Sequence, residues 1–214
     1  IQNRLEKIKN RLNEDITLVA VSKTKPVVEI KSLHGIGHID FGENKVQELV
    51  NKYGVLPKDI NWHMIGHLQR NKVKQIIPFI YLIHSVDSLR LLNKINEEAK
   101  KINRKVNILI QIKISYDNSK YGFSFDEIEY LIKNRIFDEY DFVDVKGLMG
   151  MATFTKDENI IDHEFKKLNK FYLKYRPQAN FSILSMGMSG DYKIALKNKS
   201  NMLRLGSVIF GKRN

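Results

Sequence analysis

The sequence predicts an α/β protein that folds as a single (β/α)8 TIM barrel, and three observations support this fold class. Eight short runs rich in β-branched residues recur along the 214 residues. Several runs are apolar at nearly every position, which is typical of parallel strands buried on both faces. The segments between them carry apolar residues at helical spacing. Eight units of about 27 residues suit the small end of this fold's size range.

The first segment, residues 1–16, predicts a helix outside the eightfold pattern. Leu5, Ile8 and Leu12 fall on one face of it, and charged residues surround them. We expect this extra N-terminal helix to cover the bottom or the side of the barrel. An open, doubly wound sheet is the alternative architecture, but no G-x-G-x-x-G motif supports it.

The predicted strands share runs of Val, Ile, Leu and aromatic residues. They cover residues 16–22, 39–43, 61–66, 81–86, 106–114, 143–151, 180–187 and 202–211. Two of the intervening helices are marked by apolar residues on one face. These residues are Leu89, Leu92, Ile95 and Ala99 in one helix, and Phe165, Leu168, Phe171 and Tyr172 in the other.

Three helix starts can be placed from capping residues. Pro26 suits the first helical position, because its missing N–H would have no intrahelical partner there. Asp87 or Ser88 is expected to cap the helix that follows the fourth strand. Ser124, with Glu127 three residues later, has the spacing of a capping box.

The composition indicates one globular domain over residues 1–214 and excludes several chemistries. Cysteine is absent, which excludes disulfides, cysteine–zinc sites and thiol nucleophiles. No apolar run approaches the roughly 20 residues that a membrane helix needs, and the longest, "IIPFIYLI", contains Pro78. The charged N-terminus lacks the apolar region of a secretory signal, so we expect a cytoplasmic protein without membrane contact.

The net charge of +12 favours acidic partners such as phosphates or nucleic acid. The lysines are scattered among acidic residues, as in "KINEEAKKINRK", which is typical of a solvated surface. We therefore expect nucleic acid not to be the main partner. His63 and His67 have the i, i+4 spacing of a helical metal pair, but Gly66 and the preceding strand pattern argue against one helix, so we expect no metal.

The segments after the seventh and eighth predicted strands indicate a phosphorylated ligand. In a TIM barrel, functional groups lie at the C-terminal ends of the strands, and a phosphate site commonly forms after strands seven and eight. In "SMGMSGDYKIAL", glycines let the backbone approach a ligand, Ser189 can cap, and Asp191 falls in the first turn of the next helix. "LRLGSVIFG" offers Gly206 and Ser207. Each motif alone is a common capping turn or bulge, but together they occupy the two positions that the fold predicts.

Lys23 ends the first predicted strand in "VAVSKTKP", so its amine is expected at the barrel mouth beside that phosphate. An ammonium group there can neutralise phosphate, or, when partly desolvated, attack a carbonyl to form a Schiff base. Pyridoxal 5′-phosphate (PLP) carries both an aldehyde and a phosphate. Arg204, two residues before Gly206, is then a candidate partner for the pyridine nitrogen, which it would keep unprotonated.

Eight motifs resemble, in order and from about residue 17 to residue 212, those of the YggS/PROSC family of pyridoxal phosphate homeostasis proteins. They are "VAVSKTKP", "FGENKVQE", "WHMIGHLQRNK", "VNILIQIKIS", "NSKYGF", "VKGLMGM", "LSMGMSGDY" and "LRLGSVIFG". The resemblance implies the barrel fold of the alanine racemase N-terminal domain (PLP fold type III). It also implies that PLP is held as a Schiff base on Lys23.

The resemblance further implies a set of cofactor-binding residues. They are Asn44, Ser185, Gly187, Met188, Ser189, Arg204, Gly206 and Ser207, with Arg204 toward the ring and most of the others toward the phosphate. Some family members carry tyrosine where this chain has Lys45, so a ring contact from that position has no basis here. Lys120, in "DNSKYGF", is either a solvent lysine or a secondary PLP lysine at the rim that receives or releases PLP.

Two function classes compete, and a third is kept for comparison. The first is a PLP-binding carrier or regulator in vitamin B6 homeostasis, which passes the cofactor to apo-enzymes and has no established turnover. The second is a PLP-dependent amino-acid racemase, which needs two bases on opposite faces of the substrate. Racemases supply the second base from an added C-terminal β-domain, for which we expect no room after "FGKRN". The third class is an RNA-binding protein using "LQRNKVK".

Overall fold

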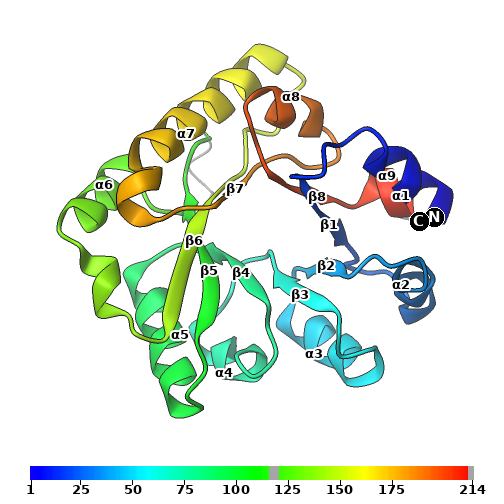
Figure 1. Cartoon of the computed structure of the whole chain (residues 1–214), viewed down its shortest axis with the longest axis horizontal. Coiled ribbons are helices and arrows are strands. Elements are labelled where there is room, and N and C mark those ends of the chain that lie inside the picture. The colour runs from blue at the N-terminus through cyan, green and yellow to red at the C-terminus, as the bar shows by residue number, and fades with distance from the viewer. Residues whose placement is uncertain (116–120, 212–214) are drawn as a thin grey trace.

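A computed structural model, which describes residues 1–115 and 121–211, forms a closed barrel of eight parallel strands (Figure 1). Each strand pairs with the next one along the chain, and the last pairs with the first. The strands are β1 (Thr17–Val21), β2 (Asp40–Glu43), β3 (Asn61–Met64), β4 (Leu82–Val86), β5 (Val106–Ile112), β6 (Val143–Gly150), β7 (Ile183–Ser185) and β8 (Met202–Leu205). The predicted fold class is confirmed.

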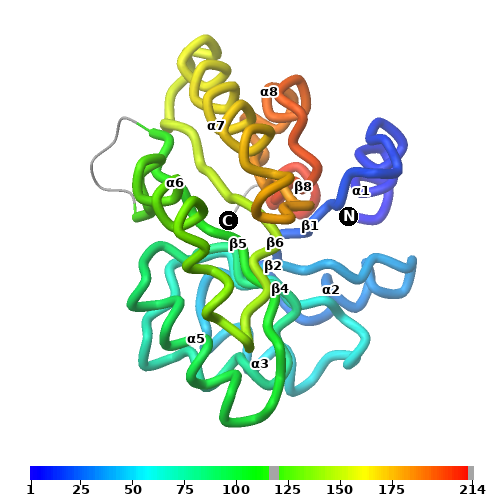
Figure 2. The backbone as a smooth tube through the Cα atoms, turned by 60° about the vertical axis from the view of Figure 1, so that its left-hand side comes forward, coloured from blue at the N-terminus to red at the C-terminus, as the bar shows by residue number. Residues whose placement is uncertain are grey.

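Helices surround this barrel on its outside (Figure 1; Figure 2). They are α1 (Gln2–Lys9), α2 (Val27–His34), α3 (Val46–Val55), α4 (Val73–Ile76), α5 (Leu89–Lys101), α6 (Phe125–Lys133), α7 (Glu158–Ala179), α8 (Tyr192–Lys197) and α9 (Ser207–Phe210), with 3-10 turns η1 (Arg70–Lys72) and η2 (Ile136–Glu139). The predicted extra N-terminal helix is present as α1, which packs beside α9. No helix in the described ranges is long and apolar enough to cross a membrane.

Two predicted helix starts are confirmed and one is displaced. The Ser88 hydroxyl caps α5 by accepting from the Leu91 N–H, and Ser124 and Glu127 form the predicted capping box of α6. Pro26, in contrast, precedes α2 in an extended conformation instead of occupying its first position.

The eighth predicted strand is wrong in its second half. β8 ends at Leu205, and residues from Ser207 to Phe210 form α9. The sequence "SVIF" is a short apolar run, and periodicity cannot distinguish a buried strand from a buried helix over so few residues. Gly206 and Ser207 therefore stand at the start of a helix, where backbone N–H groups lack intrahelical acceptors.

The barrel interior is divided between an apolar cluster and a row of polar side chains. Alternate residues of each strand face inward, and the others face the helices and join the large outer core. The inward apolar cluster comprises Val19, Leu82, Leu109, Met149 and Met202. The buried polar residues on inward positions include His63, His84, Gln111, Ser185 and Arg204. Because TIM-barrel interiors are mostly filled by branched apolar residues, this polar row indicates a functional constraint.

We expect His38 to make the protein less stable in mild acid. Burial, with a smaller contribution from the charge of Lys9, lowers the pKa of His38 to about 4, and its Nε2–H donates to the Asp40 carbonyl. The unfolded chain therefore takes up this proton first as the pH falls. The contribution of the neutral His38 side chain to the free energy of unfolding is complete above pH 6.5. It is lost as the pH falls toward 4, by about 3 kcal/mol in total.

The measurement is urea unfolding at pH 7 and pH 4.5 for wild type and His38→Gln. Glutamine can donate to the same carbonyl but does not titrate, so the variant should lose less of its free energy of unfolding between these pH values. An equal loss in both proteins would show that His38 does not carry the effect.

Candidate functional site

A cavity of about 460 Å³ opens at the C-terminal ends of β1, β2 and β8, beside the loops that follow β6 and β7. Most of the predicted cofactor-binding residues line it: Lys23, Asn44, Met188, Ser189, Arg204, Gly206 and Ser207. Ser185 and Gly187 are buried behind this lining. Lys45 is exposed and is not among the described lining residues. Lys120 lies outside the described residues, so its role stays a prediction.

The backbone on both sides of Lys23 is held by residues of α3. The Lys52 ammonium donates to the Ser22 carbonyl at 2.8 Å, and the Thr24 N–H donates to the Glu48 carboxylate at 2.6 Å. Thr24 has a left-handed backbone with φ of 64°, which costs energy for a β-branched residue and needs support from its surroundings. These contacts fix the half-buried Lys23 at the end of β1, facing the cavity.

Beneath Lys23, a buried charge cluster supports these contacts. Lys52 lies 2.7 Å from a carboxylate oxygen of Glu43 and 2.7 Å from one of Glu48, and the Ser22 hydroxyl donates to Glu43 at 2.6 Å. Burial raises the pKa of Glu43, and the charge of Lys52 opposes this increase. The second carboxylate oxygen of Glu43 is buried without a hydrogen-bond partner among the described residues. The positive charge of Lys52 thus offsets the cost of burying Glu43 in its charged form.

Arg204 brings a buried positive charge to the cavity wall. Its guanidinium donates to the Ser185 hydroxyl oxygen at 2.5 Å and to the Gly150 carbonyl at 3.0 Å. Burial lowers the pKa of Arg204 to about 10, and the nearby Asp191 acts in the opposite direction. The side chain therefore stays protonated at neutral pH and offers hydrogen-bond donors only.

The loop after β7 and the start of α9 form one continuous anion cradle. The Ser189 hydroxyl accepts from the Gly206 N–H at 3.1 Å and joins the two segments. Among the described residues, the N–H groups of Ser189 and Gly190 donate no hydrogen bond. Gly187 has φ of 93°, and a Cβ there would lie 2.7 Å from that of Ala195, so the loop can pack against α8 only with glycine.

The Met188 N–H has a different role in this loop. It donates to the Asp191 carboxylate at 2.6 Å. Asp191 itself stands one residue before α8, not in the first turn as predicted. The contact closes the loop on itself and leaves the exposed Met188 side chain at the cavity wall.

Sequence reasoning missed the loop after β6, which lines the same cavity. Its lining residues are Met151, Thr153, Phe154 and Thr155. Both Thr153 groups, the backbone N–H and the hydroxyl, donate to the buried Glu164 of α7. The signal was available, because "ATFT" directly follows the sixth predicted strand, which ends at Met151, and so lies at the functional end of a barrel.

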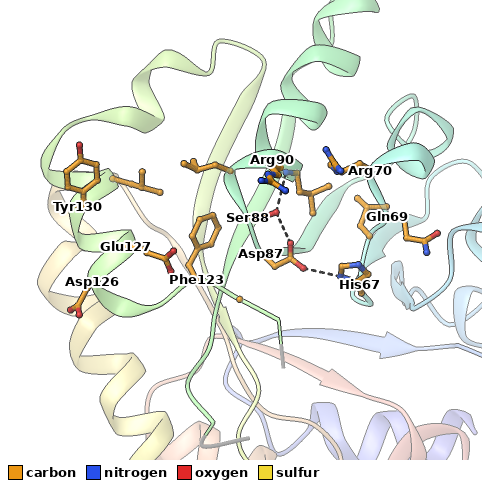
Figure 3. Close-up of a pocket in the computed structure, with 15 residues that line it drawn as sticks. His67, Gln69, Arg70, Asp87, Ser88, Arg90, Phe123, Asp126, Glu127 and Tyr130 are labelled. Carbon is orange, nitrogen blue, oxygen red and sulfur yellow. Dashed lines mark hydrogen bonds and ion pairs between the residues drawn. The ribbon is translucent and has the colours of Figure 1, made fainter. Parts of the chain in front are cut away.

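A second, larger hollow of about 990 Å³ lies beyond the ends of β3 and β4, beside α6 (Figure 3). His67 faces Asp87 across 3.0 Å there, and Arg70 and Arg90 lie on the opposite side from Asp126. No predicted cofactor-binding residue is among its described lining residues. Its arginines are exposed, whereas the smaller cavity combines a half-buried lysine, a buried arginine and backbone donors. The smaller cavity is therefore the candidate site.

The spacing of His63 and His67 does not produce a common site. His63 is buried inside the barrel and contacts His84, whereas His67 is exposed and stacks on Tyr121. In the ranges that the structure describes, no group of three or more His, Cys, Asp or Glu side chains is placed to hold a metal ion.

Comparisons with known sequences agree on one family. The family model of the alanine racemase N-terminal domain matches residues 1–214. The pyridoxal phosphate homeostasis protein of Synechocystis is 34% identical over 212 residues, which cover 94% of each chain. That of Helicobacter pylori is 36% identical over 197 residues, which cover 91% of this chain and 87% of the relative.

Solved structures show the same relationship. PipY of Synechococcus elongatus without PLP has a TM-score of 0.93 and 30% identity, covering 99% of this chain and 100% of its own. PipY with PLP bound has a TM-score of 0.89 and 28% identity, covering 98% and 99%. An alanine racemase of Clostridium difficile, at 19% identity and a TM-score of 0.82, shares the fold over 99% of this chain and 56% of its own length.

Proposed function

The chain belongs to the family of pyridoxal phosphate homeostasis proteins, and on this premise we propose that it binds PLP in the 460 Å³ cavity. In this proposal, PLP is held as a Schiff base on Lys23, and the protein acts in vitamin B6 homeostasis as a carrier or regulator with apo-enzymes as recipients. One observation carries it. A half-buried lysine, a buried arginine and a cradle of backbone donors surround one cavity of the size that small ligands occupy.

The donor set of the cavity fits the groups of PLP. Lys23, Lys25 and Arg204 line it with positive charge, against the single carboxylate of Asp191 in the described lining. The N–H groups of Ser189 and Gly190, which donate no hydrogen bond among the described residues, suit a phosphate, because phosphate oxygens accept hydrogen bonds from backbone N–H groups. When bound, PLP supplies a reactive aldehyde and an electron-withdrawing ring.

Arg204 sets how strongly such a ring would withdraw electrons. The guanidinium is a donor that stays charged, so it favours an unprotonated pyridine nitrogen. A ring without that proton is a weaker electron sink. Lys23 in turn would hold the aldehyde group of the cofactor at the cavity.

The racemase alternative needs a second base on the face of the substrate opposite Lys23. The described lining contains no histidine and no tyrosine, and of its other two groups that could act as a base, Lys25 and Asp191, the second already accepts a hydrogen bond from the Met188 N–H. An amino-acid racemization assay at high protein concentration discriminates the two functions, since turnover that disappears in Lys23→Ala would establish the enzyme and reject the carrier.

The phosphate cradle can be tested with two ligands that differ only in the phosphate. We expect wild-type protein to bind PLP more tightly than pyridoxal, as measured by the visible absorbance of titrated protein. Ser189→Ala breaks the contact with Gly206 and should weaken PLP binding about fivefold, which corresponds to the loss of one hydrogen bond. Pyridoxal binding should change little. Equal losses for both ligands would show that the cradle does not hold phosphate.

A further inference from the structure

A continuous row of hydrogen bonds crosses the barrel interior from the candidate cavity to the opposite end. Arg204 donates to Ser185 at 2.5 Å, and the Ser185 hydroxyl lies 3.3 Å from Nδ1 of His84. Nε2 of His84 lies 2.9 Å from Nδ1 of His63, whose Nε2 lies 3.1 Å from a carboxylate oxygen of Asp40. These five residues, the axial chain, come from five different strands.

The axial chain is sealed from solvent except at its two ends. Ser185, His84 and His63 have no exposed surface, and Arg204 is 4% exposed at the cavity wall. The side chain of Asp40 is 21% exposed and lines a separate hollow of about 330 Å³ beside the segment that joins α1 to β1. The axial chain therefore connects two openings at opposite ends of the barrel.

The two end residues determine the direction, from donor to acceptor, in which the hydrogen bonds of the axial chain point. Arg204 can only donate, and an ionised carboxylate can only accept. Burial alone would raise the pKa of Asp40, but hydrogen bonds from His63 and Asn61 lower it overall, so the carboxylate stays ionised. Burial, with a smaller contribution from the neighbouring His63 and Arg204, holds the pKa of His84 well below its ordinary value, so this ring is neutral.

In the state where His63 and His84 are both neutral, one arrangement of hydrogens satisfies every contact. His63 donates from Nε2 to Asp40 and accepts at Nδ1 from Nε2–H of His84. His84 then accepts at Nδ1 from the Ser185 hydroxyl, which leaves the Ser185 oxygen to accept from Arg204. Each donor points toward the carboxylate, and hydrogen bonds aligned in this way polarise and strengthen one another.

We propose that Asp40, His63, His84 and Ser185 are positioning residues for Arg204, so that a carboxylate at the far end of the barrel holds the guanidinium in one orientation at the cavity. Without Asp40, His63 loses the acceptor that selects its tautomer, and the Ser185 hydroxyl is no longer oriented. This inference rests on the proposed function only for the identity of the ligand that Arg204 faces.

The first test uses ligand-free protein and NMR of ¹⁵N-labelled side chains. The wild type should show both histidines protonated at Nε2 and a sharp Nε–H signal from Arg204. Asp40→Asn keeps the shape of the side chain but removes its charge, and it should change the histidine signals and move or broaden that of Arg204. The matched control is Asp59→Asn, which removes a carboxylate 3.0 Å from His34 on the surface and should leave all three signals unchanged.

A second variant keeps the proposal testable if Asp40→Asn does not fold. Ser185→Ala breaks the axial chain next to Arg204 and should move the Arg204 and His84 signals while His63 keeps its tautomer. An Arg204 signal that is unaffected by whichever of the two variants folds would overturn the proposal, even if the histidine signals change.

The second test adds PLP and separates the inference from the proposed function. Asp40→Asn should bind PLP about three- to tenfold more weakly than wild type and Asp59→Asn, as expected for a coupling carried by a packed network. PLP affinity that is equal in all three proteins would overturn the proposed link to the cavity. If no protein binds PLP, the proposed function fails, and the Arg204 signal alone decides the positioning role.

Discussion

Replacing Lys23 by alanine is expected to abolish covalent attachment of PLP. The variant should lack the visible absorption band that wild type develops on addition of PLP, because no other amine is held by the same backbone contacts at the end of β1. Borohydride reduction followed by peptide mass mapping should find a pyridoxyl group on Lys23 in wild type and none in the variant. Weak, reversible binding should persist, since the cradle and Arg204 remain.

The matched control is Lys25→Ala, which removes the neighbouring lysine of the same cavity. It should keep the band and the adduct on Lys23, and lose only part of the affinity for PLP through reduced positive charge. A band that survives in Lys23→Ala, or an adduct on Lys25 or Lys120, would show that the anchor is assigned to the wrong lysine.

The position of Lys23 was predictable because barrel topology determines where strand ends meet. In "VAVSKTKP" the apolar run marks β1 and Pro26 marks the start of α2, so the residues between them must lie at the rim. Ser189 and Gly206 were placed by the same rule. The second half of the eighth strand was not predictable, since four apolar residues fit a buried helix as well as a strand.

The contacts that hold the backbone beside Lys23 could not be predicted from the sequence, for a different reason. Glu48 and Lys52 have i, i+4 spacing, which usually marks an exposed helical ion pair. Nothing local to α3 shows that Lys52 reaches across to Glu43 and to the Ser22 carbonyl. The axial chain was hidden in the same way, because His63 and His84 come from separate strands and only the pairing of β3 with β4 brings their rings together.

Lys52→Met is expected to destabilise the protein by about 3–5 kcal/mol, because it leaves Glu43 as a buried charge without its cation. The variant should also bind PLP more weakly, since the Ser22 carbonyl loses the ammonium that fixes the backbone before Lys23. Urea unfolding and PLP titration measure the two effects. Lys133→Met, which removes the exposed i, i+4 partner of Glu129, is the control and should change both quantities little.

The pH dependence of this deficit identifies its cause. Without Lys52, the pKa of Glu43 rises further in the folded state, so the stability deficit of the variant is complete above this raised folded-state pKa and shrinks as the pH falls from there toward the unfolded pKa of about 4.3. The double variant Lys52→Met with Glu43→Gln should recover much of the lost stability at pH 7, because no charge remains buried. A deficit that is the same at pH 7 and pH 4.5, and that Glu43→Gln does not relieve, would instead assign the loss to packing of the lysine side chain.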